Sequence, residues 1–125
     1  MRKNLLSWQW QSYALAHRDR GNLLLHIVSV PLFAAGLFTT IAAPLVGGWL
    51  AGVGVAVMLV VLVVQGRGHR HEESPPAPFA GPLDFVTRFL AEQLITFPRF
   101  VATGGWHRAW RAAHRPAQPV AGTKA

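Results

Sequence analysis

The sequence predicts an all-α integral membrane protein built on an antiparallel transmembrane helical hairpin with flanking interfacial amphipathic helices. Residues 23–43 and 45–65 contain no Lys, Arg, Asp or Glu, and a helical run of about 20 residues reaches roughly 30 Å, the thickness of a bilayer core. All twelve Lys and Arg lie outside these runs, at residues 2–20 and 67–124. By the positive-inside rule, both termini and both basic ends of such a hairpin would lie on the cytoplasmic side.

The chain is expected to form a single membrane domain over about residues 1–115, followed by a disordered tail at 116–125. The net charge of +7 favours contacts with anionic lipid head groups and not with nucleic acid, because the basic residues flank the apolar runs. The first run starts too late and is too long to be a cleavable signal peptide. Because the chain has no cysteine, any metal must be bound by His, carboxylate or backbone groups.

The N-terminal segment precedes the first span and carries aromatic side chains. Residues 3–17 are expected to form a short interfacial helix, with two tryptophans and Tyr13 at the level of the lipid head groups. Asn22 is predicted to cap the first span, and Pro31 to kink it.

The two spans are predicted to turn at Pro44 and the glycines that follow it. Small residues occur four apart in each span, as Gly36 with Thr40 and as Gly48 with Gly52. This spacing lets helix backbones approach closely. The sequence therefore predicts tight packing between the spans.

A third helix is predicted over about residues 82–103, after a loop rich in Gly and Pro. Pro82 suits its first position. Asp84, Arg88 and Glu92 follow one side at i,i+4 spacing. The other side carries an apolar stripe of Leu83, Val86, Leu90, Leu94, Phe97 and Val101. Charges this frequent indicate an interfacial helix and not a third span.

Four of the six histidines are expected to meet at one membrane face. The hairpin would bring the start of the first span, with His17 and His26, beside the end of the second, followed by His69 and His71. Neutral imidazole is the commonest protein metal ligand, although a histidine near a helix end is more often a surface residue. His26 is the strongest candidate, because a polar group one turn inside the apolar run is costly unless it is paired.

Polar residues precede three of these histidines by four positions. Tyr13, Asn22 and Gln65 stand four residues before His17, His26 and His69, respectively. On helices, each would share a face with its histidine. Such groups can orient an imidazole through the ring nitrogen that does not bind the metal.

These residues also form a family pattern. Tyr-x3-His-x4-Asn-x3-His-x4-Pro runs from Tyr13 to Pro31, and Gln-x2-Gly-His-x2-Glu runs from Gln65 to Glu72. The chain resembles the membrane-bound family of the yeast 2-hydroxy fatty acid dioxygenase over nearly its whole length except the tail. It departs from that pattern at Ser29, where a glycine is usual, and at His71, where an aromatic residue is often found.

The resemblance implies an Fe(II)-dependent enzyme of fatty acid α-oxidation. Such an enzyme uses O2 to convert a 2-hydroxy fatty acid to the acid one carbon shorter. The resemblance also implies that His17, His26 and His69 bind iron and that Glu72 is a further polar group of the site.

The sequence and the resemblance together indicate three sets of site residues. His71 joins the three histidines above as a candidate metal ligand. Tyr13, Asn22 and Glu72 are the candidate catalytic residues. The candidates for binding the substrate carboxylate are Arg18, Arg67 and Arg70, although each could equally be a topology signal. The expected partners are the 2-hydroxy fatty acid, O2 and membrane lipid, with the oligomeric state open and a homo-oligomer included.

Three other functions compete with the iron dioxygenase. A zinc-dependent membrane lipid hydrolase would use the same histidines, since zinc often outcompetes ferrous iron at nitrogen sites. A non-enzymatic hairpin that acts as a membrane scaffold would need no metal. Haem bound between two histidines is a weaker option.

Overall fold

The computed structural model describes residues 2–113, and in this range all regular elements are helical. The expected disordered tail at 116–125 lies outside the described residues. The elements, in chain order, are α1 (Leu5–Tyr13), η1 (Ala14–Ala16), α2 (Arg20–Val46), α3 (Leu50–His69), α4 (Pro82–Ala91), η2 (Glu92–Thr96), α5 (Phe97–Ala102) and α6 (Gly105–Ala112). The prediction of an all-helical chain is confirmed.

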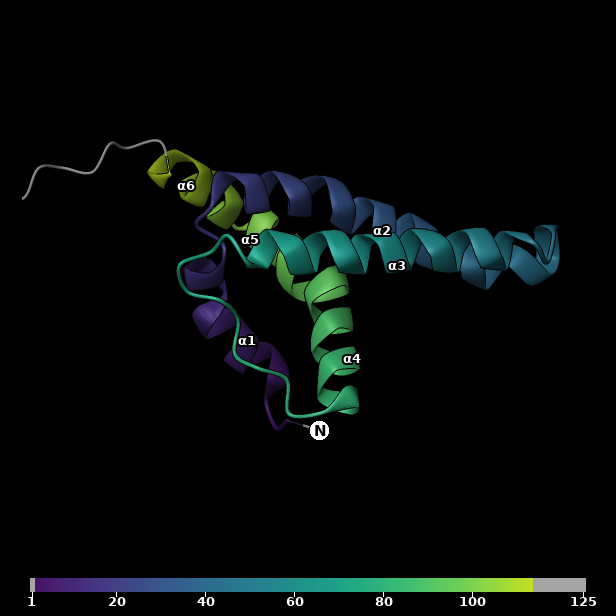
Figure 1. The fold of residues 1–125 in the computed structure, drawn as a ribbon, viewed down its shortest axis with the longest axis horizontal. Coiled ribbons are helices and arrows are strands. Elements are labelled where there is room, and N and C mark those ends of the chain that lie inside the picture. Colours follow the sequence, from purple (N-terminus) through teal and green to yellow (C-terminus); the bar gives the residue numbers. More distant parts are fainter. Residues whose placement is uncertain (1, 114–125) are drawn as a thin grey trace, which may run out of the picture.

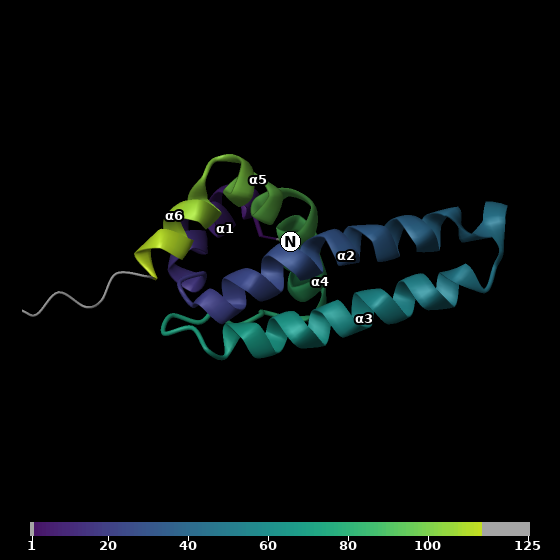
Figure 2. The ribbon, with the colours of Figure 1, turned by 90° about the horizontal axis from the view of Figure 1, so that it is seen from above.

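The two long helices α2 and α3 lie side by side, joined by a short connection at one end (Figures 1 and 2). Both are long and apolar enough to cross a membrane. Only 28% of the most apolar window of α2 and 17% of that of α3 are buried, whereas a core helix of a soluble protein would be mostly buried. Most of this apolar surface therefore faces outward.

The ends of α2 differ from the sequence-based expectation. The helix begins at Arg20, and its N-cap is Asp19, whose carboxylate accepts a hydrogen bond from the backbone N–H of Asn22 at 2.8 Å. Asn22, the expected cap, therefore lies inside the first turn with its side chain fully buried. At the other end, Pro44 lies inside the helix, which continues to Val46.

Close packing of α2 on α3 depends on one of the two expected small-residue pairs. A Cβ added at Gly36 would lie 2.9 Å from the carbonyl oxygen of Gly54, so these backbones touch. Thr40, the expected partner of Gly36, also lies at this contact. Gly48 and Gly52 were expected to let the second span pack closely on the first, but a Cβ added at either has no neighbour within 4 Å. The rotation of α3 about its axis places Gly54 at the interface.

The third helix is made of α4, η2 and α5 and, together with α1, projects sideways from the α2–α3 pair (Figure 1). Its orientation is unusual for a helix with one apolar stripe. Leu83, Val86, Leu90 and Leu94 are exposed, and Phe97 is the buried member of the stripe. Arg88, from the charged side, is buried. The polar side of this helix therefore faces the protein interior.

The aromatic core lies where α1, α5 and α6 meet the first half of α2. Tyr13, Leu23, Val30, Phe97 and Phe100 form its buried cluster. The indole N–H of Trp106 in α6 donates a hydrogen bond to the carbonyl of Leu23 at 3.0 Å. These contacts hold the short helices against the end of the long pair that carries the histidines.

Candidate metal centre

Four side chains from separate segments meet in one buried cluster, which we call the His3Glu cluster: His17, His26, His69 and Glu92. One donor atom from each lies within 4.8 Å of all the others. His17 follows η1, His26 lies in α2, His69 ends α3, and Glu92 begins η2. The imidazoles of His17 and His26 are 1% and 0% exposed, so bulk water does not solvate them.

Backbone carbonyls fix the tautomer of two of the imidazoles. The Nδ1 of His17 lies 2.8 Å from the carbonyl oxygen of Tyr13, and the Nδ1 of His26 lies 2.9 Å from that of Asn22. Because a carbonyl can only accept a hydrogen bond, each neutral ring carries its proton on Nδ1 and its lone pair on Nε2. Both Nε2 atoms point into the cluster, which is the arrangement a metal ligand requires.

The spacing of the donor atoms fits a metal ion. The Nε2 atoms of His17, His26 and His69 lie 3.4, 3.5 and 3.8 Å from Oε1 of Glu92. Ligands at about 2.1 Å from a tetrahedral ion are about 3.4 Å apart. The Nε2 atoms of His17 and His26 are also buried with no hydrogen-bond partner among the described residues. Such atoms cost free energy unless something binds them, and a cation would satisfy both.

Burial and neighbouring groups shift the pKa values of side chains in and beside the cluster. Burial lowers the pKa of His17, although Glu92 opposes this effect, so this imidazole is neutral at neutral pH. Burial alone would raise the pKa of Glu92, but hydrogen bonds from the facing imidazoles, in the form that carries a proton on Nε2, hold the pKa well below its usual range. Tyr13 donates a hydrogen bond to Oε1 of Glu92 at 3.0 Å. Burial and this carboxylate raise the pKa of the Tyr13 phenol well above its usual value, so the phenol remains a donor.

Glu92 was missing from the sequence-based site. It appeared as one member of the charged side of the third helix, and nothing in its spacing singled it out. It reaches the histidines at the start of η2, a π-helical turn, and such turns often occur at functional sites. The available signal was a carboxylate in a largely apolar segment, which is costly near lipid unless it is paired.

The residues expected to orient the rings lie close by but act differently. Tyr13 and Asn22 hold the imidazoles through their carbonyls, while the Asn22 side chain donates to Glu72 at 2.8 Å. Gln65 donates to Ser29 at 2.8 Å and exchanges hydrogen bonds with Gln93. For His17 and His26, the i−4 spacing therefore reflects a ring that reaches the carbonyl one turn earlier.

Glu72 and His71 do not enter the His3Glu cluster. Glu72 is buried, and its carboxylate accepts hydrogen bonds from the backbone N–H groups of Arg18 and Asp19 at 2.9 to 3.1 Å. It thereby joins the segment before α2 to the segment after α3. The His71 side chain is exposed, because α3 ends at His69 and the chain turns away from the cluster.

The arginines expected to bind a carboxylate are all exposed: Arg18, Arg67 and Arg70. The buried arginine of this region is Arg88, which is 5% exposed. It donates hydrogen bonds to the carbonyls of Ala77 and Pro78 at 2.8 and 3.1 Å and pairs with Asp84 at 3.3 Å. The hydrogen bond from the Ala80 N–H and the nearby Arg88 lower the pKa of Asp84, so this pair is ionic at neutral pH.

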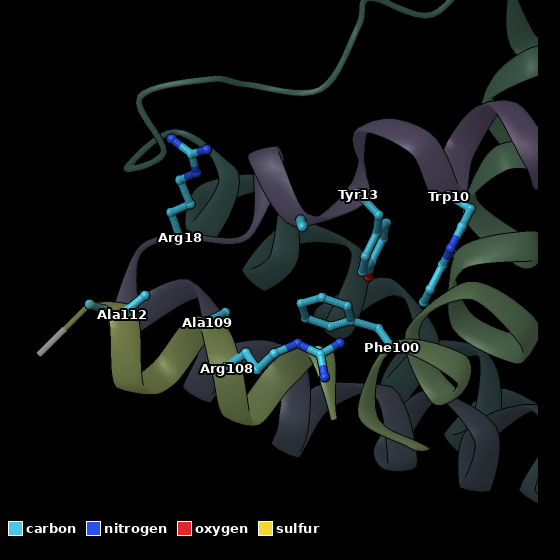
Figure 3. Close-up of a pocket in the computed structure, with 10 residues that line it drawn as sticks. Trp10, Tyr13, Arg18, Phe100, Arg108, Ala109 and Ala112 are labelled. Atoms are coloured by element: carbon cyan, nitrogen blue, oxygen red, sulfur yellow. The ribbon is translucent and has the colours of Figure 1, made fainter. Parts of the chain in front are cut away.

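Two hollows flank Tyr13. An inner cavity of about 270 Å³ reaches His17, His69 and Glu92 from the side of α4. An outer hollow of about 610 Å³ lies on the other side, between α1 and α6 (Figure 3). There Tyr13 and Phe100 point toward one another, and the Arg18 guanidinium points away from the other labelled residues. Tyr13 thus separates the cluster from the outer hollow.

Comparisons with known proteins bear on this site. A family model described as "2-hydroxy-palmitic acid dioxygenase Mpo1-like" matches residues 4–102. This range includes every member of the His3Glu cluster and both segments of the sequence pattern, Tyr13–Pro31 and Gln65–Glu72. No curated protein and no solved structure matches the chain. The family model covers most of the chain, and the chain therefore belongs to the Mpo1-like family of 2-hydroxy-palmitic acid dioxygenases.

Proposed function

We propose that this protein is an Fe(II)-dependent dioxygenase that converts a 2-hydroxy fatty acid to the fatty acid one carbon shorter. The balanced reaction is R–CH(OH)–COOH + O2 → R–COOH + CO2 + H2O. The bond between C1 and C2 breaks, C1 leaves as CO2, and C2 becomes the new carboxyl carbon. All the electrons that reduce O2 come from the substrate, so no further reductant is needed.

The observation that carries this proposal is the His3Glu cluster beside a cavity in a member of this family. Three neutral imidazoles and one carboxylate suit a divalent first-row metal. His17, His26, His69 and Glu92 would hold this ion, and the adjoining cavity would let a 2-hydroxy acid reach it. Bound ferrous ion would supply the activation of O2 that a protein side chain cannot.

The residues of the chain would prepare this site for its metal. The carbonyls of Tyr13 and Asn22 hold two rings with Nε2 directed inward. The Tyr13 hydroxyl holds Oε1 of Glu92 toward the imidazoles. Burial of the cluster excludes bulk water, which strengthens each electrostatic interaction there.

The proposal also includes an orientation in the membrane. α2 and α3 form a transmembrane hairpin, and the apolar stripe of α4 lies on the lipid surface while its polar side faces the site. The basic residues nearest the hairpin lie up to the start of α2 and in the last turn of α3, at the end of the hairpin remote from its turn. By the positive-inside rule, this supports a position of the His3Glu cluster at the cytoplasmic face. A substrate with a polar head and an alkyl tail would reach such a site directly from the bilayer.

The decisive test is O2-dependent turnover by purified protein loaded with iron under anaerobic conditions. We expect a long-chain 2-hydroxy acid to yield the shortened acid and CO2. We expect His26→Ala to lose iron and at least about 100-fold in turnover, since the ligands of a metal act as a unit. His71→Ala, which changes an exposed histidine outside the cluster, is the matched control and should keep wild-type activity.

Other outcomes would point to the competing functions. Turnover of a lipid ester by zinc-loaded protein without O2 would indicate the hydrolase. Full turnover by His26→Ala, or none by iron-loaded wild type across a panel of 2-hydroxy acids, would contradict the dioxygenase.

A further inference from the structure

The inner cavity runs from the His3Glu cluster along α1 and α4. His17, His69 and Glu92 line one end. Its walls continue along α1 as far as Trp8 and along the third helix as far as Phe85. The seven residue steps from Phe85 to Glu92 span about 10 Å of helix. The cavity is therefore a partly open channel between helices that leads away from the cluster.

The far end of this channel is aromatic. Trp8, Phe79, Phe85 and Phe89 line it, and neighbouring phenylalanine rings pack at centroid distances of 4.9 and 5.9 Å. Apolar walls with few polar groups are typical of pockets for small apolar ligands. The far end thus suits hydrocarbon.

Arg88 brings a charge to this wall, but that charge is already compensated. The guanidinium pairs with Asp84 and donates to two carbonyls of the segment 77–78. It also lies 4.3 Å from the centre of the Phe79 ring and 4.9 Å from that of Trp8. Arg88 therefore holds the segment 76–79 over the channel. Most of the hydrogen-bonding capacity of its guanidinium is used by these contacts.

We infer that this channel holds the alkyl chain of the 2-hydroxy acid, with the polar head at the His3Glu cluster and the first methylene groups between α1 and α4. Gly66 is the specificity-determining residue of this channel. The identity of the ligand rests on the proposed function. In the alternative arrangement, the whole alkyl chain of the substrate lies in lipid, against the exposed faces of α2 and α3.

The position of Gly66 explains its assignment. Leu62, Gly66 and His69 follow one another at helical spacing on α3, and all three line the channel. Residues at this spacing share a helix face. A Cβ added at Gly66 meets no atom within 4 Å, so a larger side chain fits without moving the backbone and extends along the channel wall.

The first experiment is a chain-length profile of Gly66→Leu. The matched control is Gly52→Leu on the same helix, where an added Cβ also meets nothing within 4 Å but the channel is distant. With iron-loaded protein, we expect Gly66→Leu to lower kcat/KM for long-chain 2-hydroxy acids by about tenfold or more and to spare short ones. The iron content of both variants should equal that of wild type. An unchanged profile in Gly66→Leu would overturn the inference.

Ser12→Leu, from the opposite wall on α1, is the second variant if Gly66→Leu does not fold. It should shift the profile in the same direction. Wild-type preference in Ser12→Leu would likewise contradict the channel.

The second experiment does not depend on turnover, so it separates this inference from the proposed function. Zinc-loaded protein is illuminated with a 2-hydroxy acid that carries a diazirine in the middle of its chain. We expect labelling of the peptides around Trp8 and Phe85 and a loss of this labelling in Gly66→Leu. Labelling restricted to the exposed residues of α2 and α3, such as Phe38, would place the chain in lipid and overturn the inference.

Discussion

At the scale of single residues, the metal centre depends on where lone pairs and charges point. The carbonyls of Tyr13 and Asn22 leave Nε2 of His17 and His26 free to bind. Glu92 supplies the negative charge opposite them. A neutral ring with a fixed tautomer presents its lone pair on Nε2 without first losing a proton, so metal affinity should persist at neutral pH.

Glu92→Gln tests the contribution of that charge. Glutamine keeps an oxygen that can accept from Tyr13 but removes the negative charge, and we expect metal affinity to fall by about 100-fold or more, beyond what is typical for outer-shell partners. Competition with a chromophoric chelator would measure this loss. Glu73→Gln, at an exposed position after α3, is the control and should bind metal like wild type. Equal affinity in Glu92→Gln would place Glu92 outside the ligand set.

At the scale of helices, the sequence predicts which segments form apolar helices better than it predicts how each helix is rotated about its axis. The absence of charge from 23–43 and 45–65 predicted two long apolar helices, and α2 and α3 are both long and apolar enough to cross a membrane. The same residues do not reveal which face of α3 meets α2, since both faces are apolar. Gly54 makes the contact, whereas Gly52 has the expected spacing and lies open.

The third helix was predicted with the right stripe, yet the stripe alone does not say which side faces inward. In water, the apolar side of a helix is buried. Beside lipid, the polar side can be buried instead, and here Arg88 and Glu92 point inward while Leu90 is exposed. The π-helical turn at η2 adds a residue to one turn and shifts which residues face inward. The periodicity of the sequence does not predict this turn. Glu92 was missed for these two reasons.

The glycine contact between the long helices supports a matched pair of substitutions. Gly54→Ala places a methyl group against Thr40 and the Gly36 carbonyl, and such overpacking costs about 1–3 kcal/mol. Gly52→Ala meets no neighbour and should raise stability by up to about 1 kcal/mol through helix propensity. Thermal unfolding in one detergent would compare them. Equal Tm values would show that α2 and α3 do not pack through Gly54.

At the scale of the whole molecule, the His3Glu cluster joins the packed α2–α3 pair to the segment before α2 and to the third helix. Its members come from the segment before α2, from α2, from the end of α3 and from η2. Glu72 adds a second link between the segment before α2 and the segment after α3. Sequence spacing could relate the three histidines through the hairpin, but only the folded chain brings the third helix to them. Metal binding should therefore stabilise the entire arrangement of helices.

Removal of the metal provides the corresponding measurement. A ligand that binds only the folded state adds about 2.7 kcal/mol at a free concentration of 100 times its Kd, so we expect a strong chelator to lower Tm by several degrees. Ferrous iron and zinc should each restore Tm, because both satisfy the buried Nε2 atoms of His17 and His26, whereas only iron should restore O2-dependent turnover. In His26→Ala, the chelator should leave Tm nearly unchanged, since the site is already incomplete. A wild-type Tm that is insensitive to both chelator and metal would mean that the four side chains meet without binding a cation. The assignment of the His3Glu cluster as a metal centre would then be wrong.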